Sequence, residues 1–277
     1  MAAVKTHASY TEAWECDANA HLNVQFYFRR FHEALAALCA LDGRAAPLAV
    51  QRHVRFHREQ RLDEAAVVHS GVVRDGPAAG KVLHVMTAAP GGALVATSLD
   101  DLGDASRLPG EWGAEDAVPG LPRGVDGAPS DPADARGLLA AGRAVLSDVS
   151  LAYPHRFGAD GGFLPHQFIA GFSNGAVHLW SGLGITREWL EARNLGRVAV
   201  EQKLTPFAAV EPGMVLRQIS WVAEAAEKTV LFSHQVEDAR TGAPLVRGDV
   251  RALLMDLGAR KAVPMPREVL EMAETRS

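Results

Sequence analysis

The chain has 277 residues, a formal charge of −5 and two cysteines. At about 100 to 150 residues per domain, this length predicts two domains or one large one. The charge balance, with 22% charged residues, shows no concentrated basic region, so we expect no nucleic-acid partner. The first residues lack the apolar core of a signal peptide and no stretch is apolar enough to span a bilayer. We therefore expect a cytoplasmic protein without membrane insertion.

The first half predicts one strand, one long helix and four further strands. The first strand covers residues 4–15, the helix residues 24–41, and the later strands residues 47–56, 64–74, 80–88 and 92–99. An apolar face of the helix has helical spacing: Tyr27, Phe31, Leu35 and Leu38. Four residues are expected to supply most of its polar surface: Arg29, Arg30, His32 and Glu33. Gly43 suits the C-terminal cap.

The second half repeats this order after an irregular segment. Residues 101–132 are rich in Gly, Pro and Asp, which predicts a linker or a long surface excursion, and a short helix with Asp134 near its N-terminus follows. A helix is then predicted at 162–180, a short helix at 186–194, and strands at 198–207, 214–224, 228–237 and 243–257. We divide the chain into a domain at 1–102, a linker at 103–145 and a domain at 146–277.

A single helix followed by an antiparallel meander packs best when the sheet wraps around the helix. Gly171 and Gly175 fit this arrangement, because glycine weakens a helix but allows a close approach. Weak similarity also relates the halves through three sets of residues: Tyr10 and Asp17 with Tyr153 and Asp160, residues 22–26 with 164–168, and His84 with His234. In this register Asp160 corresponds to Asp17, Pro165 corresponds to Asn23, and the histidine is absent or displaced to His166.

Four polar residues precede the first long helix: Asp17, Asn19, His21 and Asn23. Singly, such residues are most often helix caps or loop residues. Together, the spacing DxNxHxN followed by Tyr27 resembles hotdog-fold thioesterases of the 4-hydroxybenzoyl-CoA thioesterase superfamily, and it is similar to the plant acyl-ACP thioesterases of that superfamily. Ala20 stands where Gly is usual in these proteins, and Val24 stands where a second Asn is usual.

The resemblance covers nearly the whole chain apart from the linker. It implies an α+β fold of two tandem hotdog domains, each a long central helix wrapped by an antiparallel sheet, paired as a double hotdog. It also implies a hydrolase acting on acyl-CoA or acyl-ACP, with coenzyme A as part of the substrate and no other cofactor. We expect a homo-oligomer, as a dimer of double hotdogs.

Thioester hydrolysis needs a base or a nucleophile, and donors for the negative charge that develops on the carbonyl oxygen. Asp17 can act as general base or as covalent nucleophile. Free N–H groups in the first helical turn, near Val24 and Gln25, can polarise the carbonyl. Asn19 and Asn23 are expected to orient the carboxylate, the water or the thioester.

Other residues have secondary predicted roles. His21 is expected to donate to the substrate or to fix the loop, and Tyr27 is expected to bind substrate. Glu201, the counterpart of Gln51, is an accessory candidate. We expect one competent site at Asp17 and a degenerate or altered one at Asp160 with His166. The alternative of two active sites is left open, because both halves have the Asp.

Alternatives remain. No metal site is expected, because His53 and His57 lie on a predicted strand without a third ligand. A hotdog enoyl-CoA hydratase or dehydratase would have Pro after the Asn and a His five residues beyond the Asp, whereas His21 follows Asp17 by four. A non-catalytic acyl-CoA binding protein is the other alternative.

Overall fold

The computed structural model describes residues 2–17 and 19–274, and the chain divides into two compact units. The first contains the residues up to Pro129 together with Phe157–Ile169, and the second contains Ser130–Arg156 and the residues from Ala170 onward. These units differ from the predicted domains at two places. The segment after residue 102 belongs largely to the first unit, and so does a short stretch from the second half.

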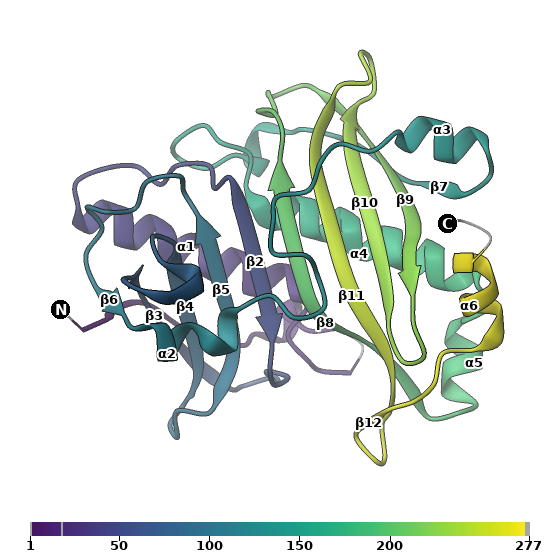
Figure 1. The fold of residues 1–277 in the computed structure, drawn as a ribbon, viewed down its shortest axis with the longest axis horizontal. Coiled ribbons are helices and arrows are strands. Elements are labelled where there is room, and N and C mark those ends of the chain that lie inside the picture. The colour runs from purple at the N-terminus through teal and green to yellow at the C-terminus, as the bar shows by residue number, and fades with distance from the viewer. Residues whose placement is uncertain (1, 18, 275–277) are drawn as a thin grey trace. The chain divides into compact units, whose positions relative to one another are not determined.

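The first unit has a long helix packed on an antiparallel sheet with strand order β1-β3-β4-β5-β2 (Figure 1). Its elements are β1 (Val4–Tyr10), η1 (Ala13–Glu15), α1 (Val24–Leu41), β2 (Gln51–Phe56), β3 (Ala65–Val73), η2 (Gly76–Ala78), β4 (Val82–Ala89), β5 (Leu94–Asp101), β6 (Glu111–Trp112), α2 (Ala114–Ala117) and η3 (Val118–Gly120). The predicted helix and four later strands are confirmed. The first strand is shorter than predicted, because the chain turns into η1 after Tyr10.

The apolar face predicted for α1 is buried at all four positions. Leu35 and Leu38 pack with Val72 of β3, which points toward the helix. The prediction that Arg30 lies on the polar surface is wrong: its side chain is only 3% exposed and pairs with Glu15. The spacing of apolar residues within the helix cannot reveal this ion pair, because Glu15 lies outside the helix.

The predicted linker is not a free connection, because its first part covers the other face of the first sheet. β6 pairs with β3 in parallel, and the Trp112 indole N–H donates to the Leu83 carbonyl at 3.0 Å. Ala117 packs against Val73 and Leu83, on the face opposite Val72. Both faces of this sheet are therefore covered, one by α1 and the other by residues 111–121.

The second unit repeats the arrangement with strand order β8-β11-β10-β9-β7 and α4 running across one face (Figure 1). Its elements are α3 (Ala135–Ala140), β7 (Ala144–Leu151), η4 (Pro154–Arg156), α4 (Pro165–Gly182), α5 (Arg187–Glu191), β8 (Leu195–Pro206), β9 (Val215–Ala225), β10 (Val230–Asp238), β11 (Pro244–Asp256), β12 (Lys261–Ala262) and α6 (Arg267–Glu274). All predicted helices and strands of this half are present. The first residues of α4 belong to the first unit by contact.

The two glycines of α4 make room for polar side chains of the sheet, as predicted. A Cβ atom on Gly175 would lie 2.6 Å from the Ser220 hydroxyl and 2.8 Å from His234 Nδ1. A Cβ atom on Gly171 would lie 2.8 Å from Gln218 Oε1. Glycine at these two positions lowers the helix propensity of α4, but it allows the helix and the sheet to approach closely.

A buried serine–histidine pair confirms the predicted match of His84 with His234. The Ser70 hydroxyl lies 2.6 Å from His84 Nδ1, and the Ser220 hydroxyl lies 2.7 Å from His234 Nδ1. All four side chains are fully buried. Burial lowers the pKa of His234 to about 3. This pair is part of the scaffold, because both halves keep it.

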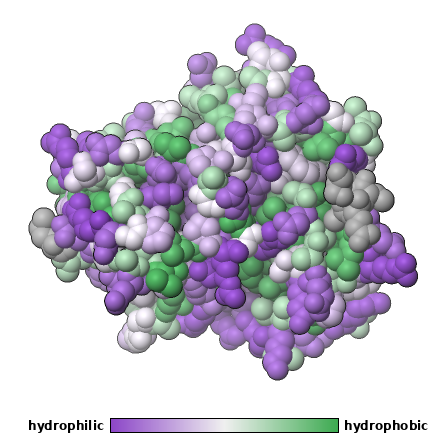
Figure 2. Space-filling model, viewed as in Figure 1, coloured by the Kyte–Doolittle hydropathy of each residue, from purple (hydrophilic) through white to green (hydrophobic). Residues whose placement is uncertain are grey.

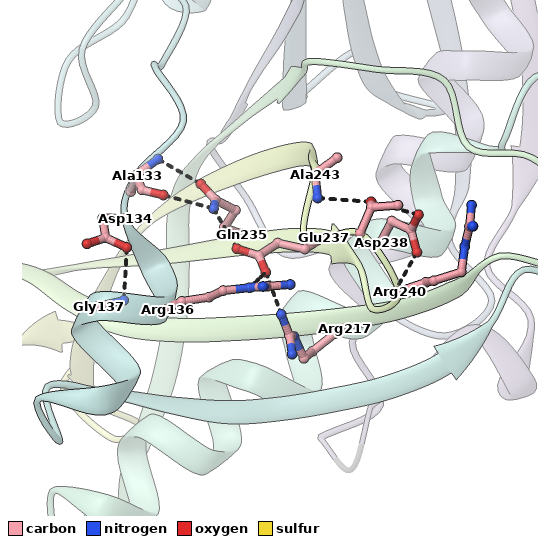
Figure 3. Close-up of polar contacts among 11 residues, drawn as sticks. Ala133, Asp134, Arg136, Gly137, Arg217, Gln235, Glu237, Asp238, Arg240 and Ala243 are labelled. Atoms are coloured by element: carbon pink, nitrogen blue, oxygen red, sulfur yellow. Dashed lines mark hydrogen bonds and ion pairs between the residues drawn. The ribbon is translucent and has the colours of Figure 1, made fainter.

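The short helix α3 is held to the second sheet by an ion pair. Its N-cap is Asp134, as predicted, whose side chain accepts the Gly137 N–H at 2.9 Å. Figure 3 shows Glu237 between Arg136, at 3.0 Å, and Arg217, at 2.9 Å. The end of the predicted linker is therefore an ordered part of the second unit.

Hydrophilic and hydrophobic residues are interspersed on the face drawn in Figure 2, in keeping with 22% charged residues. None of the helices that the structure describes is long and apolar enough to cross a membrane.

Candidate active site

Asp17 lies in a tight loop that its own carboxylate closes. The Asp17 N–H donates to the His21 carbonyl at 2.8 Å, and Asp17 Oδ1 accepts the N–H groups of Asn19 at 2.8 Å and of His21 at 3.1 Å. Within residues 2–17 and 19–274, nothing donates a hydrogen bond to Oδ2. Asp17 is exposed, and its Oδ1 is held by two backbone N–H groups.

Asn23 caps α1 and changes the predicted set of backbone donors. Its side-chain oxygen accepts the Gln25 N–H at 3.2 Å, while its own N–H donates to the Glu15 carbonyl at 2.9 Å. The Gln25 N–H is therefore occupied. The Val24 N–H has no acceptor among the described residues. Of the two predicted donors, Val24 is the available one.

Ala20 takes the left-handed backbone conformation that glycine favours, with φ of 57°. This explains why Gly is usual here in the proteins that the motif resembles. The Ala20 carbonyl accepts the Leu62 N–H at 3.0 Å, and so joins the loop to the segment that follows β2.

That segment, residues 57–64, contributes two residues that the sequence analysis missed. Glu59 Oε2 lies 3.5 Å from His21 Nε2, and both side chains are largely buried. The Gln60 N–H donates to the Tyr27 hydroxyl at 3.0 Å, and its carbonyl accepts the Leu22 N–H at 2.8 Å. The available signal was a carboxylate two residues before Arg61, but spacing from the motif does not show that the two loops meet.

Tyr27 is almost fully buried, and burial raises its pKa to about 12, with a small opposing effect of the Gln60 N–H. Its ring packs edge-on against Phe56, with centroids 5.2 Å apart. Its hydroxyl is directed at the backbone of the neighbouring segment. The structure thus gives Tyr27 a role in holding the loop that carries Glu59.

The second half has a loop of the same backbone geometry, which fixes the register between the halves. Isolated bridges join Cys16 to Leu22 and Phe157 to Phe163, so that equivalent residues differ by 141 in number. The Gly158 N–H donates to the Gly162 carbonyl at 2.8 Å, as in the first loop. The two 18-residue helices α1 and α4 keep the same interval.

This register corrects the predicted one. Gly158, not Asp160, occupies the position of Asp17, and Asp160 occupies the position of Asn19. The other replacements in the second loop are Gly161 for Ala20, Gly162 for His21, Leu164 for Asn23 and His166 for Gln25. The register predicted from sequence pairs Asp17 with Asp160 and needs a deletion after them, whereas the two loops have equal length in the structure.

The segment after β2 also has an altered counterpart. Thr11 and Ala152 make matching backbone bonds, donating to the carbonyls of Glu64 and Met214 at 3.0 and 2.9 Å. The interval of 150 between Glu64 and Met214 places Ala209 at Glu59 and Val210 at Gln60. The second half thus keeps this segment with apolar side chains at the positions of Glu59 and Gln60.

The remaining candidates lie as follows. Asp160 is exposed and accepts the Gly162 N–H at 3.0 Å. Burial, with the Arg29 charge, lowers the pKa of His166 to about 4, and burial with the Arg52 charge lowers that of His32 to about 4. Glu201 is buried on β8 of the second unit, opposite Arg251 of β11. Residues 2–17 and 19–274 contain no group of three His, Cys, Asp or Glu side chains that could hold a metal.

Comparisons with known proteins show the family and the fold of the chain. A model of the thioesterase-like superfamily matches residues 11–103 and 165–272. No curated protein sequence matches the chain. A protein of Lactobacillus plantarum described as an oleoyl thioesterase has a similar structure, with a TM-score of 0.60, 10% identity, and coverage of 91% of this chain and 96% of its own.

Two further solved structures have the same fold. The 12:0-ACP thioesterase of Umbellularia californica gives a TM-score of 0.55 at 11% identity, covering 89% of this chain and 92% of its own. An acyl-ACP thioesterase of Bacteroides thetaiotaomicron gives 0.53 at 12% identity, covering 89% and 96%.

Proposed function

The chain belongs to the thioesterase-like superfamily, and we propose that it hydrolyses acyl thioesters at one site, on the loop from Asp17 to Asn23. The observation that carries the proposal is the comparison of its two loops. Both have the same backbone closure, but the second has glycine, glycine and leucine at the positions of Asp17, His21 and Asn23. Side chains that the loop does not need for its shape are the best candidates for chemistry.

In the proposed reaction, Asp17 acts on the thioester through Oδ2, as the base for a water molecule or as the nucleophile. The bonds from Asn19 and His21 to Oδ1 hold the carboxylate in one orientation, which lowers the cost of reaching the reactive geometry. The Val24 N–H, at the start of α1, donates to the carbonyl oxygen as negative charge develops on it. Asn23 keeps this helical turn in place by capping it.

His21, on the Asp17 loop, forms a polar pair with Glu59 of the segment that follows β2. Because Glu59 lies on the Nε2 side of the imidazole, it favours a proton on that nitrogen. We assign His21 to the orientation of the substrate or water, and Glu59 to the orientation of His21. Asn19, which is exposed, is left to contact the substrate from the solvent side.

The proposed substrates are acyl-CoA or acyl-ACP thioesters. The acyl carrier protein is included because two similar structures are described as acyl-ACP thioesterases. The proposed chemistry uses protein side chains and backbone donors, with no metal and with coenzyme A only as part of the substrate. A homo-oligomer, a cytoplasmic location and a contribution of Glu201 to substrate binding remain predictions.

A panel of thioesters tests the proposal. Purified protein is incubated with short-chain, long-chain and aromatic acyl-CoA and with acyl-ACP, and the release of free thiol is followed. We expect release from at least one thioester. Hydration of crotonyl-CoA without thiol release would instead show a hydratase, and binding of acyl-CoA without any turnover would show a binding protein.

A further inference from the structure

A buried ion pair lies beneath the loop that carries Asp17. The Arg30 guanidinium, 3% exposed, donates to Glu15 Oε2 at 2.9 Å and to the Tyr10 carbonyl at 2.8 Å. The same Glu15 oxygen accepts the Glu12 N–H at 3.2 Å, and the Glu15 carbonyl accepts the Asn23 N–H at 2.9 Å. Arg30 therefore connects the end of β1, the residue that enters the loop, and the helix that leaves it.

The second half forms the equivalent loop without this pair. At the interval of 141, Arg156 stands in place of Glu15 and Gly171 in place of Arg30. The side chain of Gln218 occupies the space at Gly171 and donates to its carbonyl at 2.9 Å. Since the Gly158 loop closes with the same 2.8 Å bond, the ion pair is not required for the backbone of the loop.

A buried ion pair is not an efficient way to stabilise a fold. Removing both charges from water is expensive, and well-packed apolar replacements are often as stable or more stable. The position of Arg30 in the second half has a solution without charge. The pair is therefore an addition to the scaffold, and it occurs in the same half as Asp17, His21 and Asn23.

The surroundings of Arg30 change in the same way between the halves. Tyr27 lies one turn before it on α1, and Gln60 binds the Tyr27 hydroxyl. Thr11 and Gln60 both donate to the Glu64 carbonyl, through a backbone N–H at 3.0 Å and a side-chain amide at 2.8 Å. The counterparts in the second half are apolar: Ala152 for Thr11, Phe168 for Tyr27 and Val210 for Gln60. A polar layer thus lies beneath one loop only.

We propose that Arg30 and Glu15 are positioning residues for Asp17, an inference that rests on the proposed hydrolysis at this loop. Glu15 precedes Asp17 by two residues and holds the N–H of Asn23, so the pair fixes both ends of the loop at once. The fixed ends limit the movement of the Asp17 carboxylate relative to the first turn of α1. Misplacement of a reacting group by about 1 Å can lower the rate about 100-fold.

The test replaces the pair by apolar residues that keep its volume, as Glu15→Leu with Arg30→Met. The matched control is Arg52→Met with Asp100→Leu, because that ion pair is equally buried in the first unit and bonds to no residue of the loop. We expect kcat for thiol release to fall between 10- and 100-fold in the first variant, with KM within about 3-fold. The control should keep kcat within about 3-fold. Arg30→Lys, which keeps the charge but lacks Nη2, the nitrogen that donates to both acceptors, should lower kcat several-fold.

Hydrogen exchange gives a readout that needs no turnover. In the Glu15→Leu, Arg30→Met variant the amides of Asp17 and Asn23 should exchange at least 10-fold faster, while the amide of Gly158 is unchanged. If kcat and these exchange rates match those of the control variant, the inference is wrong, and the proposed function stands. If the wild-type protein releases no thiol, the proposed function is wrong, and unchanged exchange would reject the positioning role separately.

Discussion

Asp17 and Gly158 occupy the same position in two loops that close with the same hydrogen bond, at 2.8 Å in each. The chain therefore contains its own comparison between a loop with a carboxylate at this position and one with glycine there. In the second loop Asp160 Oδ1 accepts the Gly162 N–H at 3.0 Å, as Asp17 Oδ1 accepts the N–H of the equivalent His21 at 3.1 Å. The loop backbone therefore forms without a carboxylate at the position of Asp17 itself.

The left-handed residue of each loop gives a matched pair of stability predictions. Ala20 has φ of 57° and Gly161 has φ of 79°. A non-glycine residue in this region costs about 1–2 kcal/mol, partly offset by the greater freedom of glycine in the unfolded chain. We expect Ala20→Gly to raise the free energy of unfolding by about 0.5–1 kcal/mol and Gly161→Ala to lower it by about 1 kcal/mol. Urea unfolding measures both, and a stabilising Gly161→Ala would contradict the assigned geometry.

The glycines of α4 give a second prediction. Gly175→Ala should lower the free energy of unfolding by about 1–3 kcal/mol, because the new methyl group would meet Ser220 and His234 at 2.6 and 2.8 Å. In an open helix the same change is normally favourable by about 1 kcal/mol. Gly182, which has nothing within 4 Å of its added Cβ, is the control. If Gly175→Ala and Gly182→Ala had equal effects in thermal unfolding, the close approach of helix and sheet would be refuted.

Burial of His234 predicts a loss of stability in acid. Its pKa is about 3 in the folded chain, against an ordinary value of 6.5, so the unfolded chain binds the extra proton between these values. Stability therefore falls as the pH drops below about 6.5, by about 3 kcal/mol between pH 7 and pH 4.5 for this residue. His234→Gln should reduce the difference in unfolding free energy between those two pH values. An equal difference in wild type and variant would show that His234 does not contribute.

The pairing of His21 with Glu59 predicts a loss of activity on Glu59→Gln. Removing the charge at 3.5 Å from Nε2 weakens the orientation of the imidazole, and we expect kcat/KM to fall about 10-fold. Glu64→Gln is the control, since that carboxylate lies in the same segment but pairs with Arg58 at 2.6 Å. The thiol-release assay should leave the control within about 3-fold of wild type. Equal rates in the two variants would remove Glu59 from the site.

Much of the fold could be predicted from sequence, because it depends on local periodicity. The bounds of α1 and the order of strands follow from apolar spacing and turn residues, and the resemblance of DxNxHxN carried the fold class. The segment 103–129 was misjudged, since Gly and Pro remove periodicity whether or not a segment packs. Ala117, buried against the first sheet, shows that an irregular segment can be part of the core.

The candidate site could be proposed from sequence only where its residues adjoin in the chain. Asp17, Asn19, His21 and Asn23 form one loop, and their spacing carried the prediction. Glu59 and the ion pair of Arg30 were missed, because they reach the loop through tertiary contacts. The false match of Asp160 arose from residue identity alone, which cannot distinguish the positions of Asp17 and Asn19.

The most direct test compares Asp17→Asn with Asp160→Asn in the thiol-release assay, using the thioester that the wild-type protein cleaves fastest. The single-site account predicts that Asp17→Asn lowers kcat by about 1,000-fold or more, while Asp160→Asn stays within about 3-fold of wild type. Release that survives Asp17→Asn and disappears in Asp160→Asn would contradict the account.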